Sequence, residues 1–218
     1  MSDRVDPAVD DSSVDADRYD EHGGFPKVVT ADPGPNFAPF VEAMRTLQDL
    51  AVSVDCPDEV FGQATAQAQA LIDLLEPYRA PELHGPAGRV PSLPGNGNLL
   101  LPPWSVDRAG PAGVSMRGEF RRYHLGGNSA VHGGVLPLLF DNLFGMMVHY
   151  SGRPISRTAF LHVNYRKVTP LETPLLVEGT VDQVEGRKTF VSARLLDESE
   201  TLLADCQGLM VQLLPWQP

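Results

Sequence analysis

The sequence predicts an α+β fold in which a curved antiparallel sheet wraps around one central helix, with a helical extension on the N-terminal side. Three observations predict it. The segment 134–150 is apolar on nearly every side, which is typical of a buried helix. Strand-like segments come before and after it, and those after it are joined by the short polar turns that antiparallel strands use. Two amphipathic helical patterns precede the first strand.

Length, composition and charge limit the classes of protein. The chain has 218 residues, of which 42% are hydrophobic, enough for one domain with a core and an extension. The net charge of −11 argues against a nucleic-acid partner, because no positive field would attract phosphate. No run of 18 consecutive apolar residues occurs, so no membrane span is expected.

Cysteine usage and the N-terminus bear on location. Cys56 and Cys206 lie far apart and lack metal-site spacing. We expect two free thiols in a reducing compartment and no metal, with a disulfide between them left open. The N-terminus is acidic and polar, unlike a signal peptide, so the expected location is the cytoplasm.

The N-terminal half is expected to be mostly extension and connector. The first 35 residues are acidic and poor in large apolar side chains, so they should be disordered. Residues 36–54 and 58–78 carry apolar residues at helical spacing and should form a helical hairpin. Prolines and glycines then make a connector, with a short strand at 98–101 as an option. The predicted units are a tail over 1–35, a hairpin over 36–78, a connector over 79–112 and a domain over 113–218.

The C-terminal domain alternates between two kinds of element. Residues 113–125 show the alternation of a half-buried strand, and the buried helix over 134–150 follows. We expect the remaining strands to form a four-stranded antiparallel meander. They are predicted at 156–168, 174–184, 188–197 and 201–214.

The candidate catalytic residues lie in and just before the buried helix. Amides in a first helical turn lack internal partners and lie at the positive end of the helix dipole. Gly133 and Gly134 have no side chains, so a carbonyl oxygen that becomes negative could approach those amides. Asp141 stands alone in the apolar run, where an unsatisfied carboxylate is costly. It is about two turns too far along to reach the same atom, unless two copies pack these helices antiparallel.

Simpler interpretations of the same residues stay open. The "HGG" segment could be only a loop, and Asp141 could be a structural group that accepts hydrogen bonds from a partner segment. His132 could cap or brace the turn without taking part in chemistry.

At "VHGGVLPLLFDN" and "VNYRKVTPLETPLLVEGTV" the chain resembles the hotdog-fold thioesterases, in particular the PaaI-like acyl-CoA thioesterases. The resemblance covers roughly 113–214. It implies a hotdog fold paired into a homodimer, or a dimer of dimers, with sites between subunits. It implies hydrolysis of an acyl-CoA in fatty acid metabolism, with no cofactor beyond the coenzyme A of the substrate.

The resemblance also implies roles for residues at matching positions. Asp141 corresponds to the carboxylate that activates water or attacks the thioester, and Gly133 to the amide that polarises its carbonyl. His132 is the neighbouring histidine, and Thr158 falls where many members place a hydroxyl that positions water. Many members carry Asn or Gln six residues before the histidine, whereas this chain has Gly126. Asn128, four residues before it, is the candidate replacement.

Substrate contacts are expected around these groups. Arg166 and Lys167, at a strand end, are candidates for the phosphates of coenzyme A. An apolar acyl pocket should be lined partly by residues of the buried helix, with Gly134 allowing close approach. The candidates are Leu139, Leu143 and Met147.

Two other functions remain under consideration. A hotdog hydratase would add water to an enoyl thioester instead of cleaving a thioester. A non-catalytic module would bind acyl-CoA or lipid, and Gly126 is the feature in its favour, because polar support is missing there.

Overall fold

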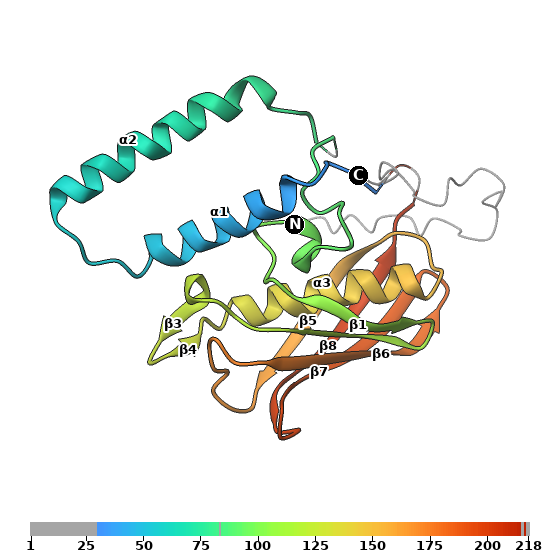
Figure 1. Ribbon diagram of the computed structural model, residues 1–218. Coiled ribbons are helices and arrows are strands. Elements are labelled where there is room, and N and C mark those ends of the chain that lie inside the picture. Colours follow the sequence, from blue (N-terminus) through green and yellow to red (C-terminus); the bar gives the residue numbers. More distant parts are fainter. Residues whose placement is uncertain (1–29, 83, 215, 217–218) are drawn as a thin grey trace, which may run out of the picture.

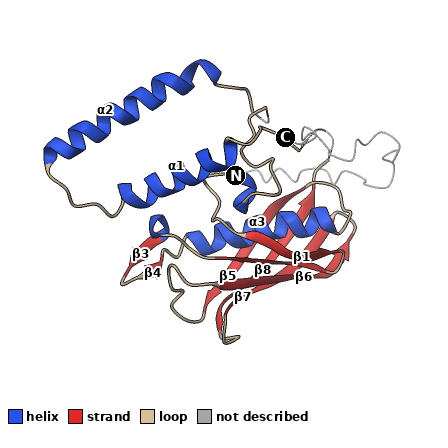
Figure 2. Ribbon diagram, viewed as in Figure 1, coloured by secondary structure: helices blue, strands red, loops and turns tan. Residues whose placement is uncertain are grey.

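The fold was analysed in a computed structural model that describes residues 30–82, 84–214 and 216 (Figure 1). A six-stranded antiparallel sheet curves around helix α3, and helices α1 and α2 form a separate extension (Figure 2). This is the predicted α+β architecture. The tail predicted over 1–35 lies almost wholly outside the described residues.

The sheet has the strand order β1-β2-β6-β7-β8-β5, with every neighbouring pair antiparallel. Alternate side chains of these strands point toward α3 or away from it, as the pleat requires. A two-stranded hairpin, β3-β4, precedes α3. The strands are β1 (Ser105–Gly110), β2 (Gly113–Gly118), β3 (Leu125–Gly127), β4 (Ala130–Val131), β5 (Ser156–Tyr165), β6 (Leu175–Glu185), β7 (Lys188–Asp197) and β8 (Leu202–Gln212).

Helix α3 (Val135–Tyr150) fills the concave side of the sheet and forms the centre of the core. Glycines let it approach closely. A Cβ added at Gly179 would lie 2.3 Å from the sulfur of Met147, and one added at Gly208 would lie 2.7 Å from the ring of Phe144. The helix therefore needs no polar face, because the strands enclose it.

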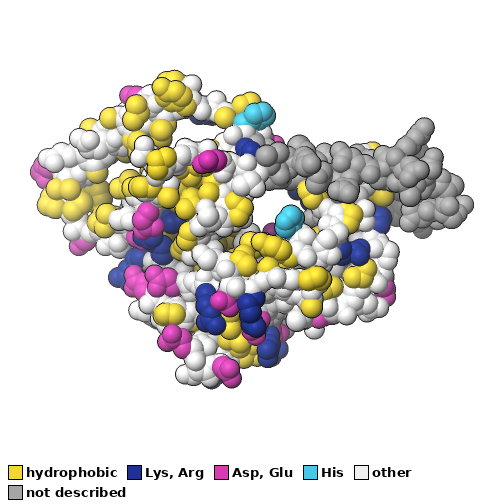
Figure 3. All heavy atoms as spheres, turned by 45° about the vertical axis from the view of Figure 1, so that its right-hand side comes forward, with side chains coloured by type: hydrophobic (Ala, Val, Ile, Leu, Met, Phe, Trp, Pro, Cys, Tyr) yellow, Lys and Arg dark blue, Asp and Glu magenta, His cyan; other side chains and the backbone are white. Residues whose placement is uncertain are grey.

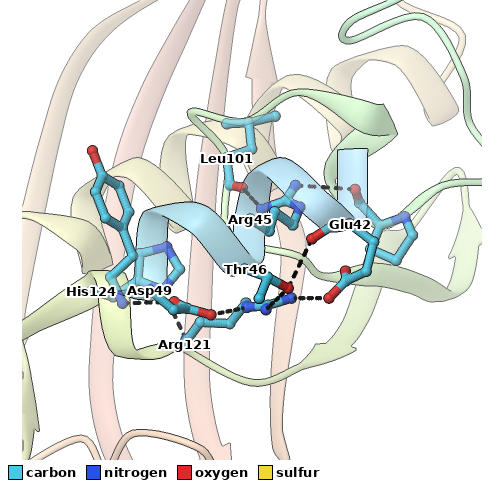
Figure 4. Close-up of polar contacts among 9 residues, drawn as sticks. Glu42, Arg45, Thr46, Asp49, Leu101, Arg121 and His124 are labelled. Carbon is cyan, nitrogen blue, oxygen red and sulfur yellow. Dashed lines mark hydrogen bonds and ion pairs between the residues drawn. The ribbon is translucent and has the colours of Figure 1, made fainter. Parts of the chain in front are cut away.

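Helix α1 (Phe37–Ala51) is tied to the domain by buried polar contacts (Figure 4). Arg45 is 3% exposed, and its guanidinium donates to the carbonyls of Asn98 (2.8 Å) and Leu101 (3.0 Å). Arg121 binds Glu42 and Asp49 of α1, each at 2.6 Å. α1 is thus anchored by charge as well as by apolar packing.

Helix α2 (Asp58–Leu75) differs from α1, since none of its residues is buried. It runs beside α1 at a distance from the sheet (Figure 1). Single turns of 3-10 helix complete the fold: η2 (Glu76–Tyr78), η3 (Pro94–Gly97) and η4 (Arg122–His124). No helix in the described part of the chain is long and apolar enough to cross a membrane.

Several predicted elements need correction. No strand forms at 98–101, because carbonyls of this segment turn toward Arg45. A strand that was not predicted, β1, lies at the end of the expected connector, and the strand predicted over 113–125 ends at Gly118. The four-stranded meander is also wrong: β6, β7 and β8 form a meander, but β5 pairs with β8 at the sheet edge. β6 pairs with β2 on its other side, which leaves no place there for β5.

Candidate active site

Asp141 lies in the middle of α3 and is neither sealed in the core nor fully exposed. Its Oδ1 accepts a hydrogen bond of 2.6 Å from the hydroxyl of Thr158 on β5. That hydroxyl is also 3.4 Å from the sulfur of Met210. A carboxylate in an apolar helix is thus paired with one hydroxyl from a neighbouring strand, an arrangement that leaves acceptor capacity for a water or a substrate.

An irregularity in β5 directs Thr158 toward α3. The register between β5 and β8 shifts between Thr158 and Phe160. Before the shift the more buried side chains have even numbers, and after it, at Leu161 and Val163, they have odd numbers. A β-bulge of this kind changes which face a side chain occupies. The bulge is therefore what allows Thr158 to lie on the same face as Leu161.

The N–H groups of Gly133 and Gly134, which precede α3, differ in their hydrogen bonding. The Gly134 N–H donates to Nδ1 of His132 (3.0 Å), and the Val135 N–H donates to the His132 carbonyl (2.9 Å). The Gly133 N–H has no acceptor among the described residues. Gly133 is exposed. Its amide is therefore the donor that a substrate oxygen could meet here.

Tyr165, at the end of β5, holds the adjacent peptide. Its hydroxyl donates to the Gly133 carbonyl at 2.8 Å, and a Cβ at Gly133 would lie 3.6 Å from its ring. The peptide between Gly133 and Gly134 is consequently held at its carbonyl by Tyr165 and at its N–H by His132. Tyr165 was not among the predicted site residues. Tyr165 comes two residues after Val163, so the alternation of a strand places it on the inner face of β5. This alternation is the one feature of the sequence that could have indicated Tyr165 as a site residue.

His132 caps the turn that leads into α3. Its Nδ1 accepts the Gly134 N–H, so in the neutral ring the proton is assigned to Nε2. The residue is exposed. This geometry matches the alternative in which His132 braces the turn, and a direct chemical role stays a prediction.

Gly133 and Asp141 are eight residues apart, which is about 12 Å along a helix axis. A single thioester carbonyl cannot touch both groups of one chain. That one site uses these groups from two copies therefore stays a prediction.

The polar helper expected near His132 is missing for a steric reason. A Cβ at Gly126 would lie 2.6 Å from Cα of His132, so no side chain fits there. Asn128 and Ser129 form the tip of the β3-β4 hairpin, both with positive φ (48° and 57°). Within the described residues no hydrogen bond joins Asn128 to Asp141. The proposed replacement by Asn128 stays a prediction.

The expected substrate contacts lie in different environments. Gly134 is exposed at the N-cap of α3. Leu139, Leu143 and Met147 are at most 1% exposed and pack inside the sheet. In the single chain these three offer no surface to an acyl group, and their contact with one stays a prediction.

The basic pair at the end of β5 is exposed. Nε of Arg166 lies 2.5 Å from Oδ2 of Asp205, and Asn164 donates to the other carboxylate oxygen at 2.8 Å. The hydrogen bond from Arg166 lowers the pKa of Asp205 and raises that of Arg166. Lys167 is exposed beside it. A phosphate could thus reach Lys167 directly, whereas Arg166 already has an anionic partner.

Cys206 lies near the carboxylate but is unsuited to nucleophilic attack. Burial raises the pKa of its thiol to about 12, and the negative charges of Asp205 and Asp141 act in the same direction. Because the thiolate is the reactive form, this thiol is inert at neutral pH. Both cysteines are free, as predicted. The carboxylate of Asp141 is therefore the stronger candidate for the chemistry.

Known thioesterases are similar to this chain in sequence. A sequence model of the thioesterase superfamily matches residues 128–204. Acyl-coenzyme A thioesterase THEM4 of Rattus norvegicus is 35% identical over 89 residues, or 40% of this chain and 38% of that protein. THEM4 of Mus musculus is 33% identical over 90 residues, with the same shares. The chain matches well under half the length of these relatives.

A solved structure extends the comparison to the fold. The crystal structure of a thioesterase superfamily protein matches with a TM-score of 0.72 and 24% identity, and it covers 85% of this chain and 100% of that chain. A match of that extent takes in residues before β1 as well as the sheet and α3. The predicted resemblance is thereby confirmed at the level of the superfamily. The segment that contains Gly133, Asp141 and Thr158 is thus similar in sequence to the thioesterase superfamily, and its fold is similar to that of a protein of this superfamily.

Proposed function

We propose that the chain hydrolyses acyl-CoA thioesters, with Asp141 as base or nucleophile and the Gly133 amide as oxyanion donor. One observation carries the proposal. A carboxylate in an apolar helix is only partly buried, it forms no ion pair with any described residue, and it accepts a hydrogen bond from the hydroxyl of Thr158. The rat and mouse relatives are acyl-coenzyme A thioesterases, which supports this substrate class.

The reaction follows from these groups. Water adds its oxygen to the thioester carbonyl carbon and gives a proton to Asp141, or the carboxylate attacks first and water cleaves the resulting anhydride. The carbon–sulfur bond breaks, and the thiolate of coenzyme A takes up a proton. The carbonyl oxygen becomes negative during the addition, and the Gly133 N–H donates to it, an interaction typically worth about 3 kcal/mol.

The complete site requires two copies of the chain. Gly133 and Asp141 of one chain are about 12 Å apart along the helix, too far to act on one carbonyl. β5 is ten residues long and lies at the sheet edge, where no other described strand pairs with its outer side, so a second strand could pair there. Two copies joined along β5 with their α3 helices antiparallel would bring Asp141 of each toward the Gly133 amide of the other.

Lys167 and Arg166 are the proposed contacts for the phosphates of coenzyme A. They follow β5 directly, next to the strand end that carries Tyr165 and therefore near Gly133. Arg166 would keep its contact with Asp205 or exchange it for a phosphate, whereas Lys167 has no ion-pair partner within the described residues.

The test is a hydrolysis screen over acyl-CoA chain lengths, with the released thiol captured by a chromogenic disulfide. Asp141→Ala and Asp141→Asn should lose about 10³-fold in turnover, within the range for a positioned base. Asp182→Asn is the matched control, because Asp182 is an exposed acid on β6 that accepts from Thr180 of the same strand and from Ser192 of β7. Native turnover in the Asp141 variants would refute the assignment.

A non-catalytic acyl-CoA-binding module remains the second candidate. Gly126 favours it, since the crowded backbone at His132 excludes any polar helper there. Tight binding of acyl-CoA by the wild-type chain, without measurable thiol release at any chain length, would support that function.

A further inference from the structure

Helix α2 presents an apolar surface that the described residues leave exposed. Eleven large hydrophobic side chains between residues 40 and 78 are 36% to 79% exposed, and five of them belong to α2. Large exposed apolar side chains that gather in one region mark an interaction surface on a soluble protein. In Figure 3 yellow hydrophobic side chains gather over the helical extension. The five are Val60, Phe61, Ile72, Leu74 and Leu75.

The charges of the extension argue against a lipid surface as its occupant. Helices that lie on membranes are rich in Lys and Arg. No Lys or Arg occurs between Arg45 and Arg79, and the charges of α2 are all acidic. Anionic lipids would repel such a helix.

The same distribution of charge fits a contact with an identical chain. In a two-fold interface a residue near the axis faces its own copy, so a charge there meets a like charge. The acids of α2 lie at its ends, and the 60–72 segment has no charged residue. Depletion of charge at the centre is also the usual composition of an interface core.

We infer that α2 packs on a second copy of this chain, through the stripe that contains Phe61, Ala64, Ala68 and Ile72. These residues recur at three- and four-residue steps and so share one helix face. All of them are exposed in the single chain. Alanines on the stripe would allow the partner to approach closely. This contact rests on the proposed function only in that two copies of the chain associate, and it does not depend on thioester hydrolysis.

Thiol protection tests the contact directly. Ala68→Cys lies on the stripe, and Ala66→Cys is the matched control on the opposite face, since two residues turn a helix by about 200°. Both are made in a Cys56→Ser background, where the buried Cys206 stays silent. In the intact protein, fluorescein maleimide should label the Ala68→Cys thiol at least about tenfold more slowly than the Ala66→Cys thiol, as expected for a site that is accessible only in a minor open form.

Three outcomes would overturn the inference. Equal labelling rates would show that nothing covers the stripe. Slow labelling in a protein that sediments as a single chain would show that another part of the same chain covers the stripe. Protection that appears only after phosphatidylcholine–phosphatidylserine vesicles are added would assign the surface to lipid.

A second pair of variants measures association. Ala68→Arg should weaken self-association about tenfold or more by sedimentation, because it places like charges in the contact. Ala66→Arg should change it less than about twofold, as an exposed substitution. Neither side chain is buried in the single chain, so a folding defect is not expected. Equal dissociation constants for both variants would contradict the inference. Thioester hydrolysis measured in the same samples reports separately on the proposed function.

Discussion

Helices α2 and α3 are similar in length but differ in what surrounds them. α3 has 16 residues, of which its own sheet buries seven, whereas α2 has 18 residues and buries none. α3 carries its one acid at its centre, where Thr158 binds it, and α2 carries its acids at its ends. Apolar residues on nearly every side predicted that α3 is buried. The amphipathic pattern of α2 did not indicate that the described part of the chain leaves its apolar side exposed.

The largest expected difference between the two helices is in stability. Phe144 is 0% exposed on α3 and touches the sheet at Gly208, whereas Phe61 is 47% exposed on α2. Phe144→Ala should lower the free energy of unfolding by about 3–5 kcal/mol, the usual cost of removing a buried ring. Phe61→Ala should cost less than about 0.5 kcal/mol in dilute protein. Urea unfolding at several protein concentrations measures both.

The concentration series also sharpens the comparison. If α2 is covered by a second copy, the loss from Phe61→Ala should grow as the chains associate, because binding to the folded state adds to stability. Equal losses for Phe144→Ala and Phe61→Ala in dilute protein would contradict the distinction between the two helices.

A smaller effect is expected at the start of α3. Tyr165→Phe removes the hydrogen bond to the Gly133 carbonyl and loosens the oxyanion donor without touching the carboxylate. We expect kcat for acyl-CoA hydrolysis to fall about fivefold, equivalent to roughly 1 kcal/mol for one hydrogen bond, with KM unchanged. Tyr150→Phe, at the other end of α3, is the matched control. A fall in both variants, or in neither, would remove Tyr165 from this role.

The smallest effect concerns the contact between α1 and the domain (Figure 4). Burial lowers the pKa of His124. The positive charges of Arg45 and Arg121 act in the same direction, and the negative charge of Asp49 opposes them. The Nδ1 of His124 accepts a hydrogen bond from the Arg121 N–H at 2.9 Å. The unfolded chain therefore binds more protons than the folded one in mildly acidic solution, and stability should decrease as the pH falls below about 6.5. Urea unfolding from pH 7 to pH 5 measures this. The slope should flatten in His124→Gln, and an unchanged slope would exclude His124 as its source.

The central features of the site were predictable because they follow from local chemistry. The apolar run around Asp141 indicated a buried helix, and the paired glycines marked its N-terminus as a place for a negative oxygen. The short polar turns predicted the β6-β7-β8 meander. Each of these inferences needs only neighbouring residues.

What was missed depends on contacts between distant segments. β1 is exposed along most of its length and follows a proline-rich segment, so it has no strand-like burial pattern to detect. The place of β5 beside β8 depends on which edge is vacant once β2 has paired with β6. Gly126 is required by the backbone of His132, and Tyr165 acts through a carbonyl 32 residues away, neither of which spacing reveals.

The central claim is that one active site uses Asp141 of one copy and Gly133 of another. Asp141→Ala and Gly133→Val chains, each inactive alone, should be co-expressed with different tags, and the mixed dimer should be purified through both. Val is chosen because a Cβ at Gly133 meets no atom closer than 3.6 Å, so its methyl groups would block the amide without disturbing the turn. The mixed dimer should recover about half of wild-type turnover, since one of its two sites is intact by symmetry. A mixed dimer as inactive as its parents would contradict the account.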